Sequence, residues 1–238
     1  NDIRRAIPLS ITSFYAKAFP NLVTVTPREI DWHPQDTDYI PYLSVSIIVV
    51  SIMVGGVLQA GIAAAKEWES GTIKELLLSP GSRWAIMVGK ILGACALNLG
   101  AVALVLAVVI GIVGVRPAHW GELVWATLLT MLIFVAYGTL LGALLQRRQP
   151  VAALALGLSL PIFFLSGSFG PISFNTPAVQ ALARLFPFYY AIVLQQHAFH
   201  NFTLNTIGVT GNALVLGGYA IVLLAAAALA LQRGTVAH

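Results

Sequence analysis

Residues 66–80 read Lys66-Glu67-Trp68-Glu69-Ser70-Gly71-Thr72-Ile73-Lys74-Glu75-Leu76-Leu77-Leu78-Ser79-Pro80 and separate two long apolar runs. This stretch holds three of the nine carboxylates of the chain and two of its thirteen basic residues. Because charged groups are costly to place in hydrocarbon, such an island of charge belongs in water. The stretch therefore predicts a hydrophilic connection between two membrane spans.

The second half of this stretch has the pattern of a short amphipathic helix. If the chain is helical after Gly71, one face carries the apolar side chains of Ile73, Leu76 and Leu77. Thr72 lies three residues before Glu75, which is a weak capping-box pattern, and Pro80 closes the segment. Two interpretations remain open from the pattern, namely an interfacial helix that merely joins two spans and a docking helix for a cytoplasmic partner.

The composition is that of an integral membrane protein. The 238 residues are 58% hydrophobic and only 9% charged, with a mean hydropathy of +0.85, whereas soluble domains are about 25% charged. The sequence has no cluster of basic and aromatic residues that would suggest a nucleic-acid partner. We attribute the net charge of +4 to basic residues that set the membrane topology. The apolar runs predict an all-α polytopic fold with spans at 39–65, 84–115, 121–145, 150–166 and 208–231. The second run is long enough to tilt or kink, and Lys90 within it is interpreted as an orientation anchor rather than a transport residue.

The apolar pattern breaks between residues 167 and 207. Gly167, Gly170 and Pro171 punctuate the break, and an apolar helical pattern resumes after Pro187. We interpret 167–207 as a re-entrant helical hairpin that dips into the outer leaflet, because irregular backbone at membrane depth must be buried in protein or line water. A complete extra span is the competing interpretation.

Basic residues near the span ends predict the orientation. If successive spans cross the membrane in alternating directions, one side carries six basic residues and the other carries two. The six are Lys66, Lys74, Arg83, Arg147, Arg148 and Arg233, and the two are Arg116 and Arg184. Since basic residues accumulate in cytoplasmic loops, we expect the connection 66–83 and the C-terminus in the cytoplasm, and the N-terminal segment outside.

The string Glu67-x-Glu69-x-Gly71-Thr72-x-x-Glu75-Leu76-Leu77-x-Ser79-Pro80 resembles the intracellular signature of the ABC type-2 permeases, the membrane halves of ATP-driven exporters. A weaker match lies at Leu165-Ser166-Gly167, around Pro171, and at Phe186-Pro187-Phe188-Tyr189-Tyr190. Together the matches extend over about residues 40–235. The resemblance implies that 66–80 is a coupling helix seated on a nucleotide-binding subunit.

The resemblance also implies a role for each residue of the signature and a set of partners. Ile73, Leu76 and Leu77 would fill a groove on the ATPase, the three glutamates would meet basic or amide groups there, and Gly71 would permit the turn. ATP and Mg²⁺ would bind to that separate ATPase subunit, and a second permease subunit, alike or different, would complete the path. We expect a bacterial cytoplasmic membrane as the location, membrane lipids as neighbours, and a periplasmic adaptor as a further candidate partner.

The sequence departs from the family pattern at its beginning. The family has six spans, and one branch carries a large external domain after the first span. Residues 1–38 lack an apolar run and mix charges with prolines. We therefore interpret 1–38 as the end of an external soluble domain, and 39–235 as the permease domain of a longer chain.

The residues offer almost no chemistry within the spans. No Asp or Glu lies inside any predicted span, which disfavours proton-coupled and sodium-coupled carriers, and Glu122 at the outer interface is the only carboxylate after Arg83. No GxxxxGK[ST] string occurs, so the energy is expected from a partner, and we assign no catalytic, cofactor or metal residue. His197 and His200 stand three apart without a neighbouring carboxylate and are interpreted as interfacial side chains rather than metal ligands.

Small and polar residues within the spans predict helix packing. Gly89-x-x-x-Gly93 and Gly138-x-x-x-Gly142 favour close intramolecular packing over a dimer seam. Gln59, Asn98 and Thr130 are expected to bond neighbouring helices.

The leading hypothesis is a permease subunit that exports an amphipathic, drug-like or lipid-like substrate. The alternatives are a polytopic enzyme acting on lipids and an assembly factor that moves nothing.

Overall fold

The computed structural model describes residues 14, 17, 39–72, 83–170 and 172–233. The chain divides into two compact units, Asn1–Asp36 and Thr37–His238. All helices named below belong to the second unit, and its described part contains no strand.

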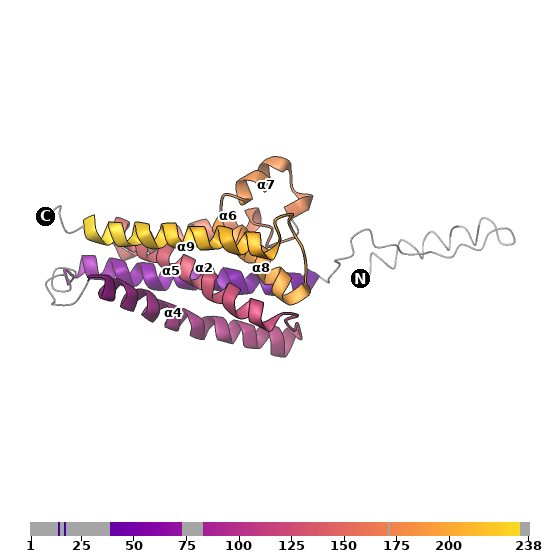
Figure 1. Cartoon of the computed structure of the whole chain (residues 1–238), viewed down its shortest axis with the longest axis horizontal. Coiled ribbons are helices and arrows are strands. Elements are labelled where there is room, and N and C mark those ends of the chain that lie inside the picture. Colours follow the sequence, from indigo (N-terminus) through magenta and orange to yellow (C-terminus); the bar gives the residue numbers. More distant parts are fainter. Residues whose placement is uncertain (1–13, 15–16, 18–38, 73–82, 171, 234–238) are drawn as a thin grey trace. The chain divides into compact units, whose positions relative to one another are not determined.

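The expected all-α fold is confirmed. The elements are α2 (Tyr39–Glu69), α4 (Arg83–Val108), the π-helix η1 (Val109–Val113), α5 (Trp120–Leu145), α6 (Arg148–Leu165), the 3-10 helix η2 (Ile172–Phe174), α7 (Pro177–Ala183), α8 (Pro187–His200) and α9 (Gly208–Arg233). Five helices in the described residues are long and apolar enough to cross a membrane, at Tyr39–Glu69, Ala85–Val113, Trp120–Leu145, Arg148–Leu165 and Gly208–Ala230. Their number and positions agree with the spans predicted from hydropathy, and the helices run roughly alongside one another in Figure 1.

Successive spans run in opposite directions, so their ends gather at two ends of the bundle. We name these two ends after the last and first residues of α2. The Glu69 end contains the last turn of α2, the start of α4, the end of α5 and the start of α6, and α9 finishes there. The Tyr39 end contains the start of α2, together with α7 and α8 (Figure 1).

Helices α2 and α5 form the centre of the bundle. In their most apolar windows 50% and 56% of the residues are buried, against 17 to 22% in the other three spans. Glycines bring the two backbones together, because a Cβ on Gly138 would lie 2.6 Å from the carbonyl oxygen of Val57. The predicted intramolecular packing is therefore confirmed for Gly138 and Gly142. It is wrong for Gly89 and Gly93, which have nothing from the described part of the chain within 4 Å of a Cβ.

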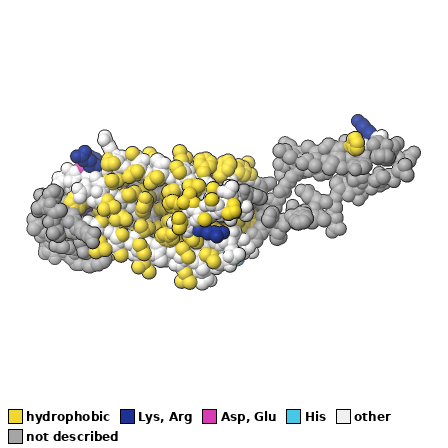
Figure 2. All heavy atoms as spheres, turned by 90° about the horizontal axis from the view of Figure 1, so that it is seen from above, with side chains coloured by type: hydrophobic (Ala, Val, Ile, Leu, Met, Phe, Trp, Pro, Cys, Tyr) yellow, Lys and Arg dark blue, Asp and Glu magenta, His cyan; other side chains and the backbone are white. Residues whose placement is uncertain are grey.

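The peripheral helices present apolar side chains outward. Exposed side chains on α4 and η1 include Leu92, Leu97, Leu104 and Ile112. Figure 2, which views the bundle from above relative to Figure 1 and so from the side of α7 and α9, shows hydrophobic side chains over much of the described surface there as well. An outward apolar surface of this kind is suited to lipid.

The break in the apolar pattern corresponds to two short helices. Helices α7 and α8 meet at an angle of 93°, and the pair counts as a sixth span only if it is one broken span. Helix α8 has 14 residues and is about 21 Å long, which is shorter than the roughly 30 Å of hydrocarbon. Its large side chains Phe188, Ile192 and Leu194 are fully buried against the bundle.

Candidate functional site

The first part of the signature is helical. The apolar run ends at Ala65, yet α2 continues through Glu69. Charged residues such as lysine and glutamate favour helix, so the helix extends past the apolar run. The helix ends at Glu69, and Gly71 turns the chain away from it. Gly71 has a φ of 72°, in the left-handed region, and its N–H donates to the carbonyl oxygen of Trp68 at 3.2 Å.

Side-chain hydrogen bonds hold the turn that follows. The Ser70 hydroxyl donates to the carbonyl oxygen of Lys66 at 2.8 Å and lies 3.0 Å from the Thr72 hydroxyl. Thr72 in turn donates to the carbonyl oxygen of Glu67 at 3.5 Å. The predicted turn at Gly71 is thus tied back to the last turn of α2. The remaining signature residues lie outside the described residues, and their role stays a prediction: Ile73, Glu75, Leu76, Leu77, Ser79 and Pro80.

Glu67 forms an ion pair with Lys90 of α4. The two side chains are 23% and 21% exposed, so water reaches the pair only in part. Lys90 is therefore an interhelical partner as well as a charge near the end of a span. Residues 23 positions apart carry no local sequence signal for such a pair.

Glu69 reaches the first residue of α6. The backbone N–H of Arg148 donates to Glu69 Oε1 at 2.8 Å, and the Arg148 Nε donates to Oε2. Helix α6 has no side-chain cap from its own N-cap residue, Arg147. The Glu69 carboxylate therefore satisfies a free N–H at the positive end of the α6 dipole.

At the Tyr39 end, Gly167 makes the turn after α6 in a left-handed conformation with φ of 82°. The Tyr42 hydroxyl donates to its carbonyl oxygen at 2.7 Å, which joins this turn to α2. Pro187 occupies the first turn of α8, where its missing N–H costs nothing. Gly170 has no described atom within 4 Å of a Cβ, and Pro171 lies outside the described residues.

Two fully buried glutamines link α8 to the central helices. The Gln195 amide donates to the Thr127 hydroxyl on α5 at 2.9 Å. The Gln196 amide donates to the carbonyl oxygen of Tyr42 on α2 at 2.9 Å and lies 3.3 Å from the Ser46 hydroxyl. These polar links make α8 part of the bundle.

One premise about the histidines is wrong, namely that no carboxylate lies beside them. His197 Nδ1 lies 2.9 and 3.0 Å from the carboxylate oxygens of Glu122, which the bundle brings to it from 75 residues away. His119 stacks on His197 with ring centroids 5.6 Å apart. His200 instead lies 3.0 Å from the Gln196 side-chain oxygen. No group of three potential ligands in the described residues is arranged for a metal ion.

Of the three polar residues expected to bond a neighbouring helix, Asn98 does so. Its amide donates to the carbonyl oxygen of Ile52 at 3.1 Å. Gln59 Oε1 and Thr130 Oγ1 are buried without a partner among the described residues.

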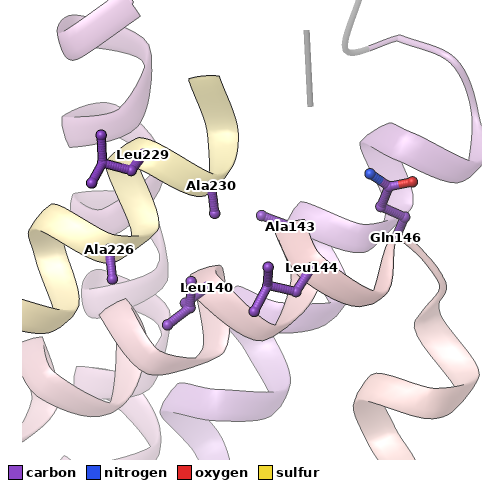
Figure 3. Close-up of a pocket in the computed structure, with 7 residues that line it drawn as sticks. All are labelled: Leu140, Ala143, Leu144, Gln146, Ala226, Leu229 and Ala230. Atoms are coloured by element: carbon purple, nitrogen blue, oxygen red, sulfur yellow. The ribbon is translucent and has the colours of Figure 1, made fainter. Parts of the chain in front are cut away.

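A groove of about 430 Å³ lies between α5 and α9 near the Glu69 end. Figure 3 shows alanines and leucines of both helices around it, with the Gln146 amide beside them. The lining is Leu140, Ala143, Leu144, Gln146, Ala226, Leu229 and Ala230. Such a lining suits an apolar chain, and the groove is separate from the ion pairs of α2.

Comparison with known proteins identifies the family. The family described as "ABC-2 family transporter protein" matches residues 2–229. Two relatives, from Escherichia coli strain K12 and Escherichia coli O157:H7, are each described as "Probable multidrug ABC transporter permease YbhR". Each is 28% identical over 151 residues, and the match covers 62% of this chain and 40% of the relative. With its multi-pass helical bundle and its family match over nearly the whole chain, this protein belongs to the ABC-2 transporter permease family.

Proposed function

We propose that this chain is the membrane-spanning part of an export permease that takes its energy from a separate ATPase subunit. ATP and Mg²⁺ would bind to that subunit, and this chain would supply the path together with a second permease subunit. The family membership supports the general class. The alternatives, a lipid-modifying enzyme and an assembly factor, have no specific observation in their favour.

The observation that carries the proposal is how the first part of the signature is held at the end of α2. Glu67 and Glu69 anchor its first part to α4 and α6, and Gly71 directs the chain out of the helix. A segment that follows such an anchored turn would pass the movement of a partner on to the spans. The coupling role of residues 73–80 is the part of the proposal that rests on sequence.

We further propose that the Glu69 end faces the cytoplasm of a bacterial cell. Basic residues concentrate at this end in the sequence, which favours the cytoplasmic side. An ATPase that uses cytoplasmic ATP must dock on the same side. The N-terminal unit would then lie outside, where a periplasmic adaptor is a further candidate partner.

The cargo we propose is amphipathic and either drug-like or lipid-like. The similar YbhR proteins are described as probable multidrug permeases. The apolar groove between α5 and α9 would accept a hydrocarbon portion, and Gln146 offers a polar group beside it.

Capture of the ATPase tests the proposal. The protein is co-expressed with a candidate ATP-binding cassette protein from the same organism, and the ATPase that copurifies is measured. The double variant Leu76→Asp/Leu77→Asp is expected to lose capture, because two carboxylates would replace the apolar contact. Leu78→Asp is the matched control, since an ideal helix places residue 78 away from that face. Undiminished capture by the double variant would contradict the coupling role.

A further inference from the structure

The two ion pairs of α2 join it to two different helices. Glu67 and Glu69 are two positions apart, so on a helix they point in nearly opposite directions. Glu67 reaches Lys90 on α4, and Glu69 reaches Arg148 on α6. The last turn of α2 is consequently held on two sides, directly before the segment assigned to coupling.

We propose that Glu67 and Glu69 are positioning residues, and that each acts through its basic partner on the neighbouring span. The pairs Glu67–Lys90 and Glu69–Arg148 make α2, α4 and α6 respond together when the segment after Gly71 is displaced. This inference rests on the proposed function. In this proposal the two glutamates form ion pairs within this chain, whereas the family resemblance implies that they contact the ATPase.

The location of Lys90 supports an internal pair. It lies seven residues after Arg83, about 10 Å along α4 from the start of that helix. An ammonium group at this depth needs either water or a carboxylate, and Glu67 provides the carboxylate. Removing one partner leaves a partly buried charge unpaired, so single substitutions at Glu67 or Lys90 should have larger effects than an exchange of the two charges.

The geometry at Glu69 supports a positioning role in a different way. One carboxylate oxygen accepts the backbone N–H of Arg148, and the other accepts the side-chain Nε. The pair therefore fixes the first turn of α6 relative to α2 by two bonds. Arg147 is the adjacent arginine, it is exposed, and it forms no ion pair with a described residue, which makes it a matched control for Arg148.

A charge exchange distinguishes positioning from docking. The protein and the candidate ATPase are reconstituted in liposomes, and two quantities are measured for each variant. The first is the amount of ATPase captured, and the second is the ratio of stimulated to basal ATP hydrolysis with a cationic dye as the probe. Glu67→Lys and Lys90→Glu should each lower the ratio roughly fivefold or more, the lower end of typical coupling energies, while capture is retained. The double exchange Glu67→Lys/Lys90→Glu should restore most of the ratio.

Two further variants complete the design. Arg148→Gln should lower the ratio, whereas Arg147→Gln should leave it near the wild-type value. The neutral pair Glu67→Gln/Lys90→Met carries no unpaired charge, so it provides the same test if a single variant fails to insert. It should keep capture and lose stimulation.

Specific results would overturn the positioning role. Loss of capture in Glu67→Lys with normal behaviour in Lys90→Glu would show that Glu67 docks the ATPase directly. A double exchange no better than the single variants, or equal effects of Arg147→Gln and Arg148→Gln, would also contradict it. Failure of the proposed function looks different, because the wild-type protein itself would then capture no ATPase.

Discussion

Gly142 of α5 lies so close to Gly61 of α2 that a Cβ on Gly142 would come within 2.4 Å of the Gly61 carbonyl oxygen. The same Cβ would lie 2.7 Å from the Cβ of Ala64. The contact is between backbones, and a side chain cannot move aside to relieve it. The close approach of the two central helices thus depends on glycine at this position.

We expect Gly142→Ala to destabilise the protein by about 1 to 3 kcal/mol, the usual cost of overpacking a close contact. Thermal unfolding in detergent, followed by tryptophan fluorescence, measures the effect. Gly157→Ala in α6 is the matched control, because that glycine has no described atom within 4 Å of a Cβ. A loss in Gly157→Ala equal to that in Gly142→Ala would contradict the packing account.

Asn98 should determine whether Gly55 tolerates a side chain. A Cβ on Gly55 would come within 2.4 Å of Asn98 Oδ1, while the Asn98 amide donates to the carbonyl oxygen of Ile52. We expect Gly55→Ala to lower the melting temperature in the wild-type background and to have little effect in an Asn98→Ala background. An equal decrease in both backgrounds would show that the clash lies elsewhere.

The buried bond between Gln195 and Thr127 should give a measurable coupling energy. Both side chains are buried, and the amide donates to the hydroxyl at 2.9 Å. A double-mutant cycle with Gln195→Met and Thr127→Val is expected to yield about 0.6 to 2 kcal/mol, the range for polar contacts between membrane helices. Additive effects of the two substitutions would mean that the bond contributes nothing.

The turn after α6 should require glycine at one position only. Gly167 has φ of 82° and a Cβ there would lie 3.2 Å from the Ile172 Cβ, whereas Gly170 has neither restriction. Gly167→Ala is expected to cost about 1 to 2 kcal/mol from the left-handed conformation alone. The melting temperature of Gly170→Ala should stay near that of the wild type. The reverse order of stabilities would refute this assignment.

Hydropathy was sufficient to predict the five spans, because a segment that crosses hydrocarbon must be apolar over its whole length. The turn at Gly71 was also predicted, since the signature implies a turn at that glycine. The extension of α2 through Glu69 was missed, because the end of an apolar run is not the end of a helix.

The partners of the charged residues could not be predicted. Glu69 meets Arg148 from 79 positions away, and Glu122 meets His197 from 75. Hydropathy states which segments cross the membrane but not which of them are neighbours. For the same reason, the sequence could not tell the two glycine motifs apart. They have equal spacing, but of the two only the motif of Gly138 and Gly142 packs against another helix.

The side of the membrane on which the Glu69 end lies tests the account most directly. In a Cys95→Ala background, Ser70→Cys places one exposed thiol at this end, and Ala118→Cys places one exposed thiol at the other. We predict that a membrane-impermeant maleimide labels residue 118 but not residue 70 in intact cells, and labels residue 70 in inside-out vesicles. Labelling of residue 70 from outside intact cells would contradict the docking of an ATPase at the end of α2.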